Sequence, residues 1–316
     1  MELLLKELYT MLEKTILDCK ADSISFSGGL DSSIIAYFLK DLKPKMYTII
    51  AKDFLAADLT YCQLFTKELN LPLEIKTVET NEILSAVEET IKILRHFNDI
   101  EIRNSVVMYL ALSKIKENGH TSVITGDGAD ELFAGYSFLL RKTENELEKD
   151  LERIRKIMHF PTNELGKNIG IEIESPFLNE GIVEFAKKLP NDLKIKTENG
   201  KKYGKWILRK AFEGKIPESI LWRDKSPMQD GSGTAGLTSL FDAIIQDSTF
   251  DEKKKRIEKE DKVILRTKES MFYYETYRKY CDPPIKLHDS PTRCPYCQGD
   301  VKETTQFCKM CGSFPI

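Results

Sequence analysis

Strand-like and helix-like segments alternate over roughly the first 135 residues of this chain. Short apolar runs predict buried strands, and the longer segments between them carry apolar residues at helical spacing. The expected strands are 23–26, 47–51, 73–78 and 122–125, and the expected helices are 3–17, 31–42, 58–69, 81–97, 105–117 and one that begins near Ala129. This alternation predicts an α/β fold with a parallel, doubly wound sheet that is covered on both faces.

The strand signal fades after Tyr136, so the C-terminal half is expected to be mainly helical. The expected helices there are 145–158, 181–189, 205–212 and 237–246. The charged run 251–269 predicts a solvated helix. Aromatic residues within 271–280 are expected to pack the last helix against the core. Residues 282–284 (DPP) should end that helix, and 285–291 should form a linker.

The turn at residues 27–33 reads SGGLDSS and joins a predicted strand to a predicted helix. Gly28 and Gly29 permit a sharp turn close to a ligand, and the helix N-terminus attracts phosphate. Asp31 can hold a metal ion on phosphate oxygens. The turn lacks the lysine and the spacing of the two common nucleotide fingerprints. It resembles the pyrophosphate loop of ATP pyrophosphatases, and the alternative is an ordinary connection.

A second strand-to-helix turn is crowded with acids and glycines. Residues 125–136 read TGDGADELFAGY. Acids in a first helical turn can simply offset the macrodipole, but they can also hold Mg²⁺ or act as a base. Ser27 and Gly126 both follow strand ends, and ligands of parallel sheets bind beyond the carboxyl ends of the strands. We therefore expect the two loops to share one crevice.

With both loops in place, the chain resembles the synthetase domain of asparagine synthetase. Further matches to that family follow in order at 174–179 (ESPFLN), 205–210 (KWILRK), 216–225 (IPESILWRDK) and 229–233 (QDGSG). The last of these also looks like the β-lactam synthetase branch. The resemblance spans about residues 5–280 and implies a fold of the ATP-pyrophosphatase, adenine nucleotide α-hydrolase-like type.

The resemblance also implies an activity, which is an ATP-dependent carbon–nitrogen ligase. Such an enzyme adenylates a carboxylate, releases pyrophosphate and forms an amide with ammonia. It implies that Asp31 and Asp130 hold Mg²⁺, that Asp127 lies near the attacking amine, and that Lys225 stabilises phosphate charge in the transition state. The residues that it assigns to ATP and pyrophosphate are Phe26, Ser27, Gly28, Gly29, Asp31, Ser32, Ser33, Ile50 and Gly126.

Some positions depart from the family pattern or stay open. Glu174 stands where the family often has Arg, and Asn179 replaces an Asp, so the acyl substrate is not identified. Lys205 and Arg209 are open between a phosphate role and a charged helix face. The first cysteine is Cys19, so the family's N-terminal glutaminase domain is not expected. Ammonia would then arrive free or from a separate glutaminase subunit, unless another amine is used.

Four of the seven cysteines form two C-x-x-C pairs with ten residues between them. They are Cys294, Cys297, Cys308 and Cys311. In a cytosolic protein this spacing indicates metal more often than disulfides, and four thiolates suit tetrahedral Zn²⁺. Two unrelated redox pairs are the alternative. We expect a domain at 1–285 and a four-cysteine zinc ribbon at 290–316, whose folding depends on the metal.

Charge and composition limit the partners. Lys and Arg number 47 against 50 Asp and Glu, so the net charge is −3 and nothing favours nucleic acid globally. No apolar run approaches the ~20 residues of a membrane helix, and we expect a cytoplasmic protein without a signal peptide. The second hypothesis is a tRNA-modifying enzyme whose ribbon grips RNA, although Arg293, Lys302 and Lys309 oppose Asp300 and Glu303 there. A structural clip is the other interpretation of the ribbon.

Overall fold

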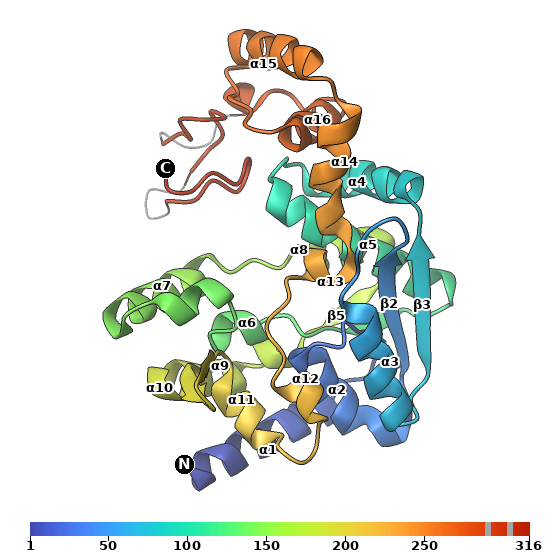
Figure 1. Cartoon of the computed structure of the whole chain (residues 1–316), viewed down its shortest axis with the longest axis vertical. Helices are drawn as coiled ribbons and strands as arrows, with labels where there is room; N and C mark the ends of the chain where they lie inside the picture. The colour runs from blue at the N-terminus through green and yellow to red at the C-terminus, as the bar shows by residue number, and fades with distance from the viewer. Residues whose placement is uncertain (288–291, 302–305) are drawn as a thin grey trace. The chain divides into compact units, whose positions relative to one another are not determined.

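The computed structural model describes residues 1–287, 292–301 and 306–316 (Figure 1). Packing divides the chain into two units. Unit 1 consists of Met1–Ile50, Ala57–Lys76 and Ala111–Pro227, and unit 2 consists of Ala51–Ala56, Thr77–Leu110 and Met228–Ile316. Unit 1 contains both predicted loops, and unit 2 contains the paired cysteines. The expected domain boundary between residues 285 and 290 stays a prediction.

A five-stranded parallel sheet orders the N-terminal half of the chain, in the order β3-β2-β1-β4-β5. The strands are β1 (Ser23–Ser25), β2 (Lys45–Ala51), β3 (Leu73–Val78), β4 (Ser122–Ile124) and β5 (Glu172–Glu174). Ile24 pairs with Met46 on one side and with Ile124 on the other. The strand order reverses between β1 and β4, which is the switch point where ligands of such sheets bind. The predicted fold class is confirmed.

Several helices of unit 1 bury one face against a large apolar core, whereas the buried residues of α7 belong to a second, smaller cluster. In α1 the residues Leu8, Leu12 and Ile16 recur every four positions and are fully buried, so they form a single stripe. That stripe belongs to the same apolar cluster as Ile34 and Ile35 of α2. The helices and turns are α1 (Glu2–Leu17), α2 (Leu30–Leu39), η1 (Lys40–Leu42), α3 (Asp58–Glu68), α6 (Ala129–Leu132), η2 (Ser137–Arg141), α7 (Glu144–Ile157), α8 (Pro161–Ile169), η3 (Pro176–Leu178), α9 (Glu180–Lys188), α10 (Asn191–Lys194), α11 (Trp206–Ala211) and α12 (Glu218–Leu221).

Unit 2 is helical, and α16 lies beside α4 and α14 (Figure 1). Tyr273, Tyr274 and Tyr277 of α16 are buried, which confirms that aromatic residues pack the last long helix into the interior. Tyr280 lies beyond the helix and is 41% exposed, and its hydroxyl donates a hydrogen bond of 2.6 Å to Glu88 of α4. The elements are α4 (Thr80–Leu94), α5 (Asp99–Glu117, which continues into unit 1), α13 (Met228–Ser232), η4 (Thr234–Gly236), α14 (Leu237–Ile244), α15 (Asp247–Asp261), α16 (Lys268–Tyr277) and η5 (Pro284–Lys286).

The prediction of one solvated helix over 251–269 is wrong. Helix α15 ends at Asp261, where Lys262 takes a left-handed conformation with φ +59°. Val263 and Leu265 then turn inward and are buried. Ile264 between them is 40% exposed, so buried and exposed side chains alternate as they do in an extended segment.

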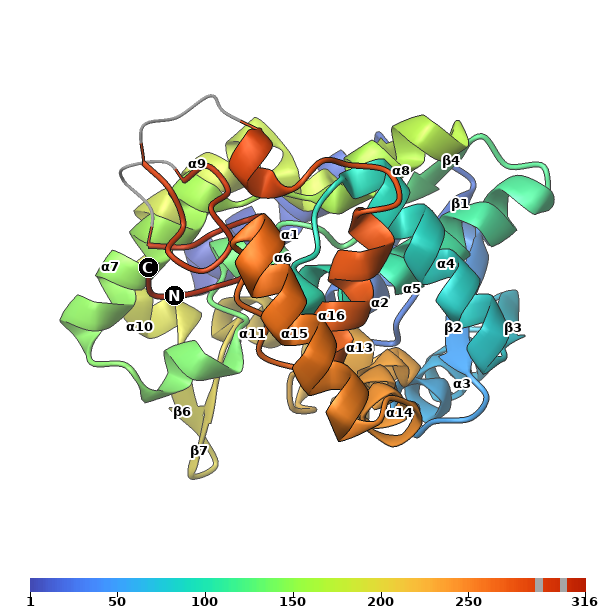
Figure 2. The same ribbon diagram turned by 90° about the horizontal axis from the view of Figure 1, so that it is seen from above.

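The described part of the C-terminal half is mainly helical, as predicted, but it also contains three short strands. Besides β5, the chain forms an antiparallel hairpin of β6 (Lys196–Glu198) and β7 (Lys201–Tyr203) (Figure 2). Asn199 and Gly200 connect the two strands with φ values of +50° and +79°. An Asn-Gly pair is the strongest local signal for such a turn, so the sequence did contain the information.

Two expectations concern the ends of elements and the membrane. The expected linker 285–291 overlaps η5 at its start, and its residues 288–291 lie outside the described residues. Within the described parts of the chain, every helix is too short or too polar to cross a bilayer.

Candidate active site

The SGGLDSS turn is shaped by one glycine that no other residue could replace. Gly28 has φ +62°, and a Cβ atom there would lie 2.7 Å from the amide nitrogen of Cys62 in α3. Helix α2 then begins after Gly29 without a side-chain cap, so its first N–H groups remain available to an anion. The Ser33 hydroxyl is buried and has no hydrogen-bond partner among the described residues. The turn therefore has the features of a phosphate site.

The two predicted loops are adjacent at the switch point of the sheet. A Cβ atom on Gly126 would lie 3.0 Å from Cβ of Asp31, so the loop after β4 packs directly on the start of α2. Gly128 has φ +95° and abuts Leu178. The glycines of the second loop thus serve close packing, which acids alone would not require.

Four charged side chains alternate in sign across this junction, and we call them the charge chain: Asp31, Lys205, Asp130 and Lys225. Lys205 Nζ lies 2.5 Å from Asp31 Oδ2 and 2.6 Å from Asp130 Oδ1. Lys225 Nζ lies 2.6 Å from Asp130 Oδ2. The Lys205 side chain is only 4% exposed, whereas that of Lys225 is 30% exposed. Lys225 is therefore the one of the two lysines that can readily meet an incoming ligand.

These contacts set the ionisation of the group. Burial alone would raise the pKa of Asp130, but the ammonium groups of Lys205 and Lys225 outweigh burial and hold that pKa well below its usual range. Burial lowers the pKa of Lys225, yet Asp130 and Asp31 together raise it above its ordinary value. Asp130 and Lys225 are thus charged at neutral pH.

Asp127 has a different environment from Asp130. Its carboxylate accepts a hydrogen bond of 3.0 Å from Thr125 Oγ1. Burial raises the pKa of Asp127, although the hydroxyls of Thr125 and Thr162 act in the opposite direction. A carboxyl group with a raised pKa is a better proton acceptor than an ordinary aspartate. Glu131 is engaged elsewhere, since Tyr136 donates a hydrogen bond of 2.5 Å to it.

The position of Lys205 depends on unusual backbone geometry. The residue has φ +53°, and its N–H donates to the carbonyl of Phe133 at 2.9 Å. Any side chain on Gly135 would overlap Asp130 and Lys205, and any side chain on Gly204 would overlap the Ala134 carbonyl. Gly135, the last glycine of the GDGADELFAGY stretch, is therefore needed because the segment that carries Lys205 packs directly against it.

Lys205 and Arg209 are both buried, so the interpretation of a charged helix face is wrong for each of them. Arg209 donates from Nε to the Gly204 carbonyl at 2.9 Å and from Nη1 to the carbonyls of Leu221 and Arg223. It secures the segment that leads to Lys225. The sequence could not predict that these two residues are buried, because Lys and Arg are normally exposed.

Arg223 is a residue that sequence reasoning missed. Its Nη1 donates to the Gly28 carbonyl at 3.1 Å, and its Nη2 lies 2.8 Å from Asp58 Oδ1. The guanidinium also stands over the ring of Tyr61, 3.9 Å from its centroid. Arg223 therefore ties the Lys225 segment to the SGGLDSS turn and to α3. Its place two residues before the predicted catalytic lysine was the available signal.

The remaining predicted residues lie around this centre. Phe26 and Ile50 are buried, and their role at adenosine stays a prediction. Glu174 accepts hydrogen bonds from the backbone N–H groups of Lys20 and Ala21, so its carboxylate serves the fold. Asn179 caps α9 by accepting from the N–H of Gly181 at 3.0 Å, a task that the family's Asp could equally perform.

The residues present fit a divalent ion. Asp31 and Asp130 both reach one ammonium nitrogen, so a single cation can contact both carboxylates. Asp31 Oδ1 is buried and accepts no hydrogen bond from the described residues, an arrangement that normally has an explanation such as a ligand. Carboxylate oxygens are the ligands that Mg²⁺ prefers.

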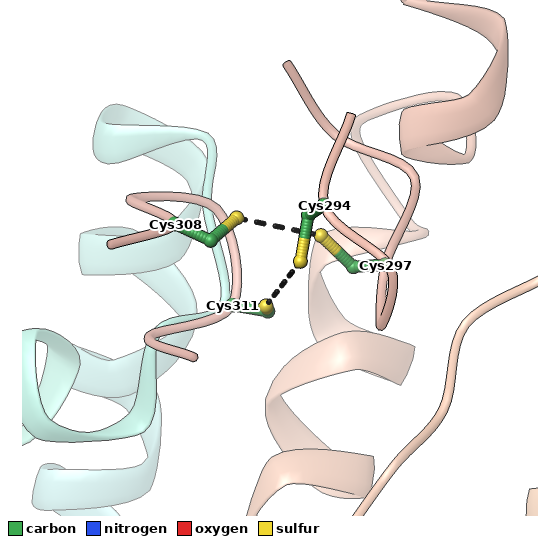
Figure 3. Close-up of side chains that lie close together, drawn as sticks. All are labelled: Cys294, Cys297, Cys308 and Cys311. Atoms are coloured by element: carbon green, nitrogen blue, oxygen red, sulfur yellow. Dashed lines mark hydrogen bonds between the residues drawn. The ribbon is translucent and has the colours of Figure 1, made fainter. Parts of the chain in front are cut away.

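In unit 2 the four paired cysteines converge, as Figure 3 shows. All four sulfur atoms lie within 4.8 Å of one another. The Cys294–Cys311 distance is 3.7 Å and the Cys297–Cys308 distance is 3.6 Å. Tetrahedral Zn²⁺ with bonds of about 2.3 Å would separate its sulfur ligands by about 3.8 Å. The cluster fits zinc, and its closest sulfur pairs join the two C-x-x-C segments, unlike separate redox pairs.

Each C-x-x-C segment also contacts a different part of unit 2. In the first knuckle (residues 294–297), the carbonyl of Tyr296 accepts from Ile264 N–H at 2.7 Å, and the Arg266 guanidinium lies over the Tyr296 ring. In the second knuckle (residues 308–311), the carbonyl of Met310 accepts from Phe97 N–H at 3.0 Å. The cluster thus joins the α15–α16 connection to the α4–α5 junction.

The fold and the site place the chain in the ATP-pyrophosphatase class, as the order of the strands and the glycine–serine turn at the switch point indicate. The family model of asparagine synthase matches residues 23–164 and 144–284. The chain belongs to the asparagine synthase family, and the resemblance of its motifs is thereby confirmed.

Individual relatives agree with the family match. Asparagine synthetase [glutamine-hydrolyzing] 1 of Arabidopsis thaliana is 30% identical over 71% of this chain and 41% of its own length. Asparagine synthetase B of Escherichia coli is 29% identical over 71% of this chain and 43% of its own length. The Gallus gallus enzyme is 29% identical over 80% of this chain and 48% of its own length. The chain spans less than half of the length of these relatives.

Proposed function

We propose that this protein is an ATP-dependent ligase that adenylates a small carboxylate and converts it to an amide with ammonia. The observation that carries the proposal is the charge chain, which lies between the SGGLDSS turn and the GDGADE loop at the switch point of the sheet. The family membership of the chain supports the same reaction, since its relatives are named asparagine synthetases.

In the first step a carboxylate oxygen of the substrate attacks the α-phosphorus of ATP. The bond from that phosphorus to the bridging oxygen breaks, and pyrophosphate leaves. The SGGLDSS turn would hold the β- and γ-phosphates with N–H groups and hydroxyls. Asp31 and Asp130 would hold Mg²⁺, which neutralises phosphate charge when bound. Lys225 is accessible enough to stabilise the charge that grows on the leaving oxygens.

In the second step ammonia attacks the acyl carbon of the adenylate, and AMP leaves with the bonding electrons. The attacking nitrogen must lose a proton. We assign Asp127 to accept this proton. Burial raises the pKa of its carboxyl group, and by resemblance Asp127 stands at the motif position where the family has an acid. Phe26, Ile50 and Gly126 are assigned to the adenosine end of the nucleotide.

In the test, purified protein is incubated with ATP, Mg²⁺, ammonia and each of a panel of small carboxylates that includes aspartate. The products formed from ATP are then measured. We expect AMP and pyrophosphate in equal amounts, and only when a suitable carboxylate is present. Formation of ADP and phosphate would contradict the proposal, since it would mean attack at the γ-phosphorus. Pyrophosphate release that requires tRNA and ignores small carboxylates would overturn the assignment of the substrate.

For unit 2 we propose a structural zinc ion at Cys294, Cys297, Cys308 and Cys311. The support is the tetrahedral spacing of the sulfur atoms and the contacts of both knuckles with segments of the same unit. Those contacts favour the clip over the RNA-binding ribbon, because the Tyr296 and Met310 backbones face their own chain. Lys302 and Glu303, which entered the charge balance of the ribbon, lie outside the described residues.

A further inference from the structure

Lys205 is a buried cation to which the proposed reaction assigns no step. Its Nζ lies within 2.6 Å of carboxylate oxygens of both Asp31 and Asp130, and its side chain is 4% exposed. A divalent ion that contacts both carboxylates must displace this ammonium group or join it. Lys205 and the metal therefore compete for the same two oxygen ligands.

The charges of the group decide when a metal can enter. Asp31 and Asp130 contribute two negative charges, and Lys205 and Lys225 contribute two positive ones. A divalent ion without nucleotide would add two positive charges to a group whose net charge is zero. It would also be repelled by the two nearby ammonium groups. An ion that arrives on a polyphosphate brings the missing negative charge with it.

The backbone holds Lys205 in this place. Lys205 has φ +53°, a left-handed conformation that is uncommon for a residue other than glycine. The N–H bond to the Phe133 carbonyl and the close packing at Gly135 and Gly204 maintain that conformation. The packing of the chain therefore fixes the ammonium group between the two aspartates.

We propose that Lys205 is an internal counter-cation that positions Asp31 and Asp130 before the nucleotide binds and excludes free divalent ions from them. Metal then enters only together with the phosphates, and Lys205 is released toward the phosphate oxygens. The inference rests on the proposed function for the nature of that ligand, but not for the competition between lysine and metal.

The experiment measures binding of Mn²⁺ alone, without nucleotide, by the electron paramagnetic resonance signal of the free ion. Mn²⁺ suits this purpose because it prefers carboxylates to the thiolates of the cysteine cluster. The proteins are the zinc-loaded full chain, Lys205→Met, and the control Lys210→Met, whose lysine lies in α11, the helix that follows Lys205, and pairs with Glu213 and Glu198. A fourth protein adds Asp130→Asn to Lys205→Met.

We expect Lys205→Met to bind Mn²⁺ at least about tenfold more tightly than the unchanged protein, because one positive charge has left the site. Lys210→Met should match the unchanged protein, and Asp130→Asn should abolish the gain. Equal affinity in Lys205→Met, or a gain that survives Asp130→Asn, would overturn the proposal. Pyrophosphate release is not used, so a failed ligase assignment would leave this result intact.

The two carboxylates could repel each other in Lys205→Met and weaken the fold. Thermal unfolding with and without Mn²⁺ covers this case, since added Mn²⁺ should raise the melting temperature of Lys205→Met and leave that of Lys210→Met unchanged. A Lys205→Met protein that stays unfolded at saturating Mn²⁺ would also refute the proposal, because metal could then not replace the lysine.

Discussion

Lys205 and Lys225 contact the same aspartate but differ in exposure, and this difference separates their functions. Lys205 is enclosed by two carboxylates, whereas Lys225 has 30% of its side chain exposed. An enclosed ammonium group organises its neighbours, and an accessible one can follow charge as it develops on a substrate. This difference supports our proposal that Lys205 positions the aspartates and that Lys225 stabilises charge in the transition state.

Replacement of Lys225 by Ala should remove turnover and spare nucleotide binding. We expect pyrophosphate release to fall by about 10²–10³-fold, which is typical for the loss of one group that stabilises transition-state charge. ATP affinity, measured by equilibrium dialysis, should change little. Lys210→Ala serves as the control, because its lysine has similar exposure but pairs at the surface. Normal turnover in Lys225→Ala would remove our assignment of this residue.

Lys194 is a buried lysine outside the site and should lower stability at neutral pH. It is 2% exposed at the end of α10, and burial, assisted by Arg155, lowers its pKa from 10.5 to about 8. Its folded pKa is below its unfolded value, so the unfolded chain binds more protons between pH 8 and 10.5. The free energy of unfolding should rise across that interval.

The substitution Lys194→Met tests this linkage. Below pH 8 it should raise the free energy of unfolding by about 1–3 kcal/mol, and the gain should shrink toward pH 10.5. Urea unfolding at pH 7 and pH 10 measures both values, with Lys188→Met as the exposed control on α9. A gain that is equal at the two pH values would show that packing, not charge, is responsible.

At the scale of elements, the two knuckles connect two segments of unit 2 that lie far apart in the sequence. The α15–α16 connection and the α4–α5 junction each donate a backbone hydrogen bond to a carbonyl of the cysteine region. The second junction also includes Phe97, whose ring contacts Tyr274 at 4.9 Å. A metal that joins the knuckles therefore stabilises the packing of α16 as well as the tail.

Cys294→Ser should release zinc and loosen this arrangement. We expect bound zinc to drop to well under one per chain and the melting temperature to fall by several degrees, since structural zinc contributes directly to folding free energy. Cys281→Ser is the matched control, because Cys281 lies outside the cluster. Unchanged zinc content in Cys294→Ser, measured by atomic emission, would contradict the four-cysteine site.

At the scale of the whole molecule, paired carboxylates should make the protein sensitive to acid. The ammonium groups of the charge chain hold the pKa of Asp130 below its usual range despite burial. Hydrogen bonds from Tyr280 and Lys279 do the same for Glu88. Groups with lowered folded pKa values contribute stability above the unfolded pKa of about 4, and this stability is lost as the pH falls through the folded value.

We therefore expect the free energy of unfolding to decrease steadily below about pH 5. Asp130→Asn should be less stable than the unchanged protein at pH 7, because it removes the aspartate that pairs with Lys225 and one of the two that pair with Lys205. The difference in stability should narrow toward pH 3. Chemical unfolding across this range measures both trends. A difference that stays constant with pH would mean that the charge of Asp130 does not contribute to stability.

The local sequence determined those elements and loops whose structure depends on interactions between residues close together in the chain. Glycine and serine after a buried strand, and periodic apolar residues in α1, depend only on short-range geometry and therefore predicted their structures correctly. The spacing of the paired cysteines likewise predicted that the four would form one cluster. The Asn199-Gly200 pair is an equally local signal for a hairpin turn, although the hairpin was not among the predicted elements.

Tertiary structure alone decided which charges meet. Asp31 and Lys205 are 174 positions apart, and nothing in either local sequence states that Lys205 is buried or that Arg223 holds the Gly28 carbonyl. Burial and ion pairing arise when β1, β4 and the segment before α11 converge, so they are properties of the packed chain. The sequence alone could therefore indicate the type of chemistry, whereas the electrostatics that govern it required the fold.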